Sequence, residues 1–140
     1  MMRNLIGVLT LMMAGRMMTL AFLHRAGRGL DGDPPAAWLM PLIGDAVIGV
    51  TALVVAWLVW TKRGLLVWAG IIAWNVAGAW DALSAYIVSA TAPWPKFFML
   101  QVFGSSMFFM AAAMHVVILW LITRPQMQAH FIGDEAHKPA

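Results

Sequence analysis

Four long apolar segments occupy almost the whole of this 140-residue chain. Each is roughly 20 to 25 residues long, the length that a helix needs to cross about 30 Å of hydrocarbon. A soluble core does not require so much apolar sequence, since 62% of the residues are hydrophobic and only 11% are charged. The sequence therefore predicts an all-α integral membrane protein built as a four-helix bundle.

Polar turns and prolines separate the four segments. A loop of turn-forming residues follows the first segment, Lys62-Arg63-Gly64 forms a tight turn after the second, and Pro93 and Pro95 end the third. We expect spans at about 5–24, 38–60, 65–91 and 97–122, connected up-down-up-down, followed by a polar surface tail at 126–140. Tryptophans that suit the headgroup region mark the predicted span ends at Trp38, Trp60, Trp94 and Trp120.

Positive charge is divided unequally between the two ends of the predicted bundle. The end with both termini carries Arg3, Lys62, Arg63, Arg124 and Lys138, and the opposite end carries Arg25, Arg28 and Lys96. Asp31 and Asp33 also lie on the poorer side. Because loops rich in Lys and Arg stay in the cytoplasm, we expect both termini inside (N-in, C-in) and a bacterial cytoplasmic (inner) membrane.

Three ionisable residues interrupt the predicted spans: Arg16 in the first, Asp45 in the second and Asp81 in the third. Counted at about 1.5 Å per residue, all three lie roughly 10 to 16 Å below the outer surface. Charge at that depth is costly unless it is paired, buried in the bundle or functional. We therefore expect Arg16 to pair with a carboxylate in a single polar layer.

The helical periodicity predicts which residues surround these charges. Asn75 is expected to hydrogen-bond across the same interface. A rough polar stripe on the fourth segment is expected to close the site from the remaining side, and it consists of Gln101, Ser105, Phe108, Ala112 and His115. Small residues mark close helix contacts in membranes, and we expect such contacts at Gly49, Ala73, Ala77 and Gly78.

One carboxylate is in surplus, because Arg16 neutralises only one of the two. This surplus favours the binding or conduction of a small polar species or a proton through Arg16, Asp45, Asn75 and Asp81. Two alternatives stay open. The polar residues could lock the helices in register without doing chemistry, and the chain could be an accessory subunit of a larger membrane complex or a homo-oligomer.

The residue pattern does not favour a cofactor or an active site. His115 invites a haem or redox interpretation, but no second imidazole lies at its depth, so we expect a neutral histidine hydrogen-bonded to a backbone carbonyl. The methionines, including Met12, Met13, Met17 and Met18, are better explained by packing than by copper. No cysteine, phosphate-binding loop or nucleophile motif is present, and we expect no enzymatic activity.

Neither a metal ion nor nucleic acid is predicted as a ligand. His130, Asp134 and His137 have a spacing that would gather a metal on one helical face, but a solvated tail is the preferred interpretation, and no metal site is predicted. The net charge of +3 comes from scattered loop residues, so we expect the lipid bilayer, not nucleic acid, as the partner.

Two short motifs carry a resemblance to a known group of proteins. Gly44-Asp45 lies within residues 41–49, and Trp74-Asn75-x-x-Gly78-x-x-Asp81 lies in the third segment. In these motifs the chain resembles a set of uncharacterised small bacterial four-helix membrane proteins. The resemblance implies the bundle and directs attention to Asp45, Asn75, Gly78 and Asp81, and it implies no substrate.

Overall fold

The computed structural model describes residues 1–26, 28, 34–93, 96 and 98–133. Every regular element of this part of the chain is helical, which confirms the all-α prediction. In chain order the elements are α1 (Met2–Met12), the 3-10 segment η1 (Met13–Thr19), α2 (Leu20–Leu23), the 3-10 turn η2 (Ala36–Trp38), α3 (Leu39–Thr61), α4 (Leu65–Thr91), α5 (Phe98–Phe103), α6 (Ser106–Ile122) and α7 (Pro125–Ile132).

Three helical stretches are long and apolar enough to cross a membrane: Met2–Leu23, Ala36–Thr61 and Leu65–Thr91. The predicted spans at 5–24, 38–60 and 65–91 fall on these stretches. A fourth crossing requires α6 and α7 to count as one span, although the two helices are bent by 70° relative to each other.

The predicted span at 97–122 is not one continuous helix. It divides into α5 and α6 around Gly104, whose φ of 57° lies in the left-handed region that glycine enters without a steric penalty. The sequence prediction overlooked this break because Gly104, Ser105 and Ser106 interrupt the apolar residues only briefly and no proline stands among them.

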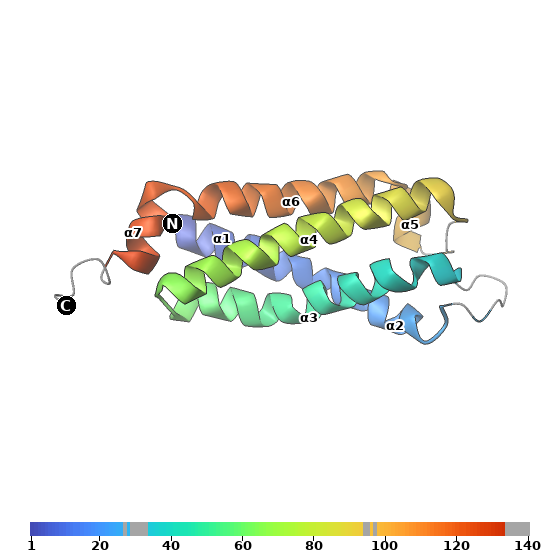
Figure 1. Cartoon of the computed structure of the whole chain (residues 1–140), viewed down its shortest axis with the longest axis horizontal. Helices are drawn as coiled ribbons and strands as arrows, with labels where there is room; N and C mark the ends of the chain where they lie inside the picture. The colour runs from blue at the N-terminus through green and yellow to red at the C-terminus, as the bar shows by residue number, and fades with distance from the viewer. Residues whose placement is uncertain (27, 29–33, 94–95, 97, 134–140) are drawn as a thin grey trace.

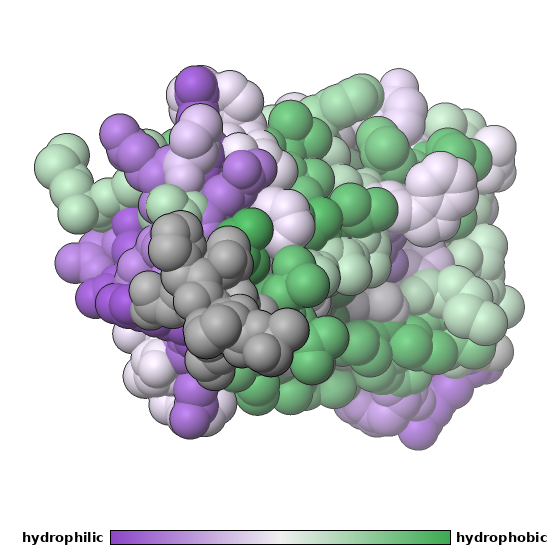
Figure 2. Space-filling model, turned by 60° about the vertical axis from the view of Figure 1, so that its left-hand side comes forward, coloured by the Kyte–Doolittle hydropathy of each residue, from purple (hydrophilic) through white to green (hydrophobic). Residues whose placement is uncertain are grey.

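The helices pack along one another, as Figure 1 shows. α4 contacts both α3 and α6, while α1 and η1 lie against α3. Large apolar side chains nevertheless cover much of the outer surface, among them Met40, Leu66 and Trp80. Figure 2 shows the result as a broad hydrophobic region beside hydrophilic residues gathered toward the end where α7 lies. An apolar exterior of this kind suits contact with lipid.

The C-terminal segment differs from the expected solvated tail as far as Ile132. Pro125 begins α7 at a favourable first position, and Met127 and Phe131 are buried in the same apolar cluster as Ile6 and Ile122. The amide of Gly64 donates a hydrogen bond of 2.8 Å to the Phe131 carbonyl. Met127 and Phe131 are four residues apart, so both project from the face of α7 that is buried. Asp134 and His137, whose spacing with His130 was considered for a metal, lie outside the described residues, as does Lys138.

The tryptophans at the predicted span ends do not share one environment. Trp38 is only 2% exposed and donates from its indole to the Pro93 carbonyl at 2.9 Å, so it belongs to the core. Trp120 is exposed and stacks under the Arg124 guanidinium at 3.7 Å. Trp94 lies outside the described residues, as do Asp31 and Asp33.

Candidate polar site between the helices

Arg16 joins the carboxylates of two different helices. Its Nε lies 2.5 Å from Oδ1 of Asp45 on α3, and its Nη2 donates to Oδ2 of Asp81 on α4. The three side chains are only 11%, 18% and 16% exposed, in the order Arg16, Asp45 and Asp81. The structure thus brings together the three charged residues that the sequence placed at a common depth. We refer to them as the triad.

The remaining guanidinium nitrogen of Arg16 extends the network to α6. Nη1 lies 3.1 Å from Nε2 of His115 and 3.4 Å from the Gly78 carbonyl oxygen. Arginine only donates, so Nε2 of His115 must accept, which assigns the ring as neutral with its proton on Nδ1. That proton is donated to Oδ1 of Asn75 at 3.0 Å. The amide nitrogen of Asn75 in turn donates to the Ile71 carbonyl at 2.8 Å.

His115 therefore differs from its expected role. It is fully buried, and its partners are the side chains of Arg16 and Asn75, not a backbone carbonyl. The ring of Trp74 approaches it edge-on, with centroids 5.2 Å apart. Both ring nitrogens are engaged, so a haem iron bound at His115 would have to displace one of these hydrogen bonds.

The 3-10 conformation of η1 explains how Arg16 reaches the carboxylates. Residues three apart eclipse in a 3-10 helix, so Met13, Arg16 and Thr19 project from one side of the segment. The Thr19 hydroxyl lies 2.8 Å from the Arg16 carbonyl, to which it donates, and 3.3 Å from the Leu42 carbonyl on α3. The segment is thereby held against α3 with Arg16 directed at Asp45.

Three glycines provide the space in which the network sits. A Cβ on Gly44 would lie 1.7 Å from Oδ1 of Asp81, and one on Gly78 would lie 2.3 Å from Cε1 of His115. A Cβ on Gly49 would lie 2.1 Å from the backbone nitrogen of Met17. Gly49 and Gly78 therefore do serve close packing, one against a backbone and the other against a ring.

Other residues assigned by periodicity lie elsewhere. Ala73 and Ala77 are exposed. Residues four apart in an α-helix are separated by about 400°, so a row of small residues with this spacing turns about the helix axis by about 40° at each step. Gln101 is exposed on α5, and Ser105 lies in the break before α6. Among the described residues, the hydrogen-bond and ion-pair partners of the triad include neither Gln101 nor Ser105. The break at Gly104 lies between Gln101 on α5 and His115 on α6.

Gly44 contributes to the network but was noticed only as part of the Gly-Asp motif. His115 was expected in the polar stripe that closes the site, but with a backbone carbonyl as its partner in place of Arg16 and Asn75. A glycine directly before a buried aspartate was the available signal for Gly44. For His115, the signal was a histidine in the middle of an apolar helix, where a buried imidazole requires polar partners.

A cavity of about 680 Å³ opens beside the triad. Arg16 and Asp45 supply its charged part, and nearly all of the remaining lining is apolar. It lies between the first helical stretch and the region of α5 and α6, and six methionines line it: Met12, Met13, Met18, Met107, Met110 and Met114.

Comparisons of the chain with protein-family models, with curated proteins and with solved structures found no match. Within residues 1–26, 28, 34–93, 96 and 98–133, no group of three His, Cys, Asp or Glu side chains is placed to hold a metal ion.

Proposed function

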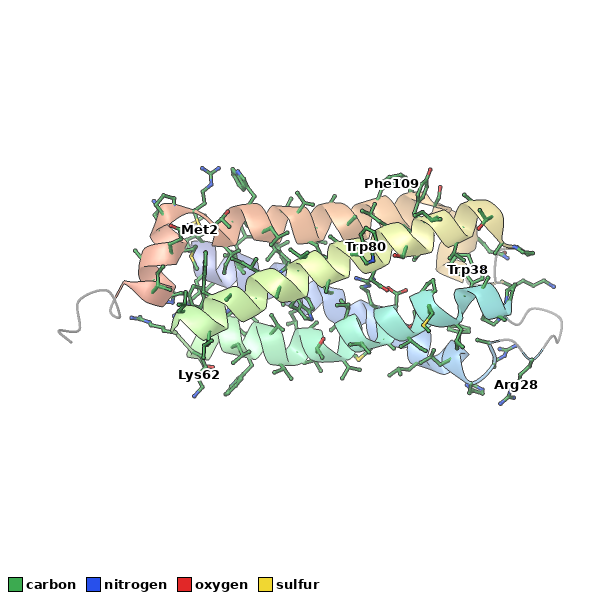
Figure 3. All side chains as sticks on the ribbon, viewed as in Figure 1. Met2, Arg28, Trp38, Lys62, Trp80 and Phe109 are labelled. Atoms are coloured by element: carbon green, nitrogen blue, oxygen red, sulfur yellow. The ribbon has the colours of Figure 1, made fainter. Side chains whose placement is uncertain are left out.

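We propose that the chain is a four-helix membrane protein of a bacterial inner membrane, connected up-down-up-down with both termini in the cytoplasm. Contacts between α4 and α7 support the common location of the turn after α3 and the C-terminal helix. Met2 and Lys62 lie at one end of the molecule, and Arg28 and Trp38 at the other (Figure 3). The basic residues Arg3, Arg63 and Arg124 belong to the end of Met2 and Lys62, which suits the positive-inside rule.

We infer that the triad binds or conducts a proton or a small polar cation. The observation that carries this proposal is the sharing of one guanidinium by two carboxylates. With both acids ionised the triad has a net charge of −1 in a poorly hydrated setting. A proton or one monovalent cation restores neutrality, and either one relieves the repulsion between Asp45 and Asp81.

The mechanism is charge compensation. Arg16 holds one carboxylate ionised, while the other takes up and releases its proton or cation as water reaches it. His115 positions the guanidinium through Nη1, and Asn75 fixes the imidazole in the tautomer that accepts from Arg16. In a purely structural lock the same contacts would form, but neither carboxylate would exchange anything.

Flux through vesicles that contain the purified protein tests this function. The wild type is expected to move protons or a monovalent cation, detected by an enclosed dye, when a gradient is imposed. Asp45→Asn and Asp81→Asn should each abolish the signal, since either change removes the surplus charge. Asp134→Asn, made outside the described residues, serves as the matched control. Unchanged flux in a folded Asp45→Asn or Asp81→Asn protein would reject the proposal.

A further inference from the structure

The cavity beside the triad has methionine walls contributed by two separate parts of the chain. Met12, Met13 and Met18 come from the first helical stretch. Met107, Met110 and Met114 follow at intervals of three and four residues on α6, so they project from one face of that helix. In the sequence these methionines looked scattered, and only the fold collects them.

The charged part of the cavity is able to accept a positive group. Nε, Nη1 and Nη2 of Arg16 all have partners in the protein. Asp45 uses only Oδ1, and no described residue donates to its Oδ2. A ligand entering this cavity therefore finds a free carboxylate oxygen and an occupied guanidinium, which favours a cation over an anion.

The size and walls of the cavity define the rest of the ligand. About 680 Å³ lies within the range of sites that hold whole organic molecules and far exceeds the volume of a metal ion. Methionine side chains are flexible and polarisable, and proteins use them where a binding surface must adapt to several apolar shapes. Met18 and Met110 line the cavity and are 69% and 63% exposed, so we place its mouth at these two side chains.

We propose that this cavity binds an amphipathic organic cation, with its positive charge near Asp45 and its apolar groups among the methionines. The inference rests on the proposed function, because the same surplus carboxylate receives the ligand. Binding of the organic cation and binding of the proton are then mutually exclusive. The cation enters from the side of the bundle through the mouth at Met18 and Met110.

Saturation binding of radiolabelled tetraphenylphosphonium to the purified protein tests this inference. One cation per chain is expected, with an affinity that falls as the pH is lowered. Tetraphenylborate has the same shape and the opposite charge, so it should not bind. Asp45→Asn should reduce the affinity for tetraphenylphosphonium at least tenfold. Equal binding of both ions would show adsorption to apolar surface only and would overturn the proposal.

Two glycines offer a matched pair of variants that avoid the triad. Gly15 lines the cavity, whereas Gly70 lies on α4 away from it, and a Cβ on either one would meet nothing within 4 Å. Gly15→Phe should fill the cavity and weaken tetraphenylphosphonium binding at least tenfold, while Gly70→Phe should bind as the wild type does. Unaltered binding in a folded Gly15→Phe protein would overturn the location.

The outcomes separate this inference from the function on which it rests. Proton or small-cation flux in the wild type without saturable tetraphenylphosphonium binding would reject the organic ligand and leave the triad function standing. Stoichiometric Cu(I) binding without tetraphenylphosphonium binding would likewise reject it, in favour of thioether ligation by the methionines. Loss of organic-cation binding together with retained proton flux in Gly15→Phe is the result that supports both.

Discussion

The carboxylate of Asp81 occupies the space that a side chain on Gly44 would fill. A Cβ at position 44 would lie 1.7 Å from Oδ1 of Asp81 and 2.5 Å from its Cγ. Gly44 directly precedes Asp45, so one short segment of α3 supplies one carboxylate partner of Arg16 and also the space for the other, Asp81. The two carboxylates can share the guanidinium only because residue 44 has no side chain.

Gly44→Ala should displace Asp81 from Arg16. The added methyl forces the carboxylate or the helix to move, and overpacking of this kind costs about 1–3 kcal/mol of stability. Thermal unfolding of the purified protein measures the loss. Gly70→Ala is the matched control, because nothing lies near its Cβ and alanine favours the helix. Equal stability of Gly44→Ala and the wild type would contradict the geometry.

His115 and Asn75 should be energetically coupled, because they share one buried hydrogen bond. His115→Ala and Asn75→Ala each leave a partner unsatisfied, at a cost of about 1–3 kcal/mol. The double variant should lose less stability than the sum of the two single losses, by about 0.5 kcal/mol or more. Chemical unfolding of the four proteins completes the cycle. If the two losses of stability were simply additive, Asn75 would not be the residue that fixes the tautomer of His115.

Arg16→Met should destabilise the protein by about 3–5 kcal/mol, because two poorly hydrated carboxylates lose their counter-charge. Arg16→Lys retains the charge but lacks the planar fork that meets Asp45 and Asp81 with separate nitrogens, so an intermediate loss is expected. Adding Asp45→Asn and Asp81→Asn to Arg16→Met should restore much of the stability. If the triple variant were no more stable than Arg16→Met, charge compensation would not be the reason.

Phe131→Ala should destabilise the end of the molecule where α7 docks. The ring is 2% exposed and packs in the cluster with Ile6 and Met127, and removal of a buried Phe side chain costs about 3–5 kcal/mol. Gln126→Ala on the exposed side of α7 is the control and should have little effect. Limited proteolysis and thermal unfolding both report on the docking. If Phe131→Ala behaved as the wild type does, the result would contradict the docking and support the predicted solvated tail.

Much of the fold follows from the sequence because lipid imposes a simple length requirement. A segment that crosses hydrocarbon must pair its backbone N–H and C=O groups within itself. A long apolar run such as Leu65–Thr91 therefore predicts a helix with clear ends. The break at Gly104 was not foreseen, since its cause is one glycine in the left-handed region, and only two serines and no proline stand beside it in a largely apolar segment. Docking of α7 depends on Phe131 finding a place between helices, which no local pattern specifies.

The meeting of Arg16, Asp45 and Asp81 was also accessible from the sequence, since burial of charge requires compensation and the counted depths agree. The partners of His115 were not accessible, because they depend on the rotation of α6 about its axis. The helix contacts predicted at Ala73 and Ala77 are not formed for a related reason. A row that turns by about 40° per step faces a neighbouring helix over only part of its length.

Infrared titration of the carboxyl groups tests the central claim most directly, because a protonated carboxylic acid and a carboxylate absorb at different frequencies. We expect one titrating carboxyl group in the wild-type triad. We also expect the signal to be lost in both Asp45→Asn and Asp81→Asn, since Arg16 then holds the single remaining acid ionised. Two carboxylates that stay ionised over the whole pH range in which the protein is folded would contradict the central claim.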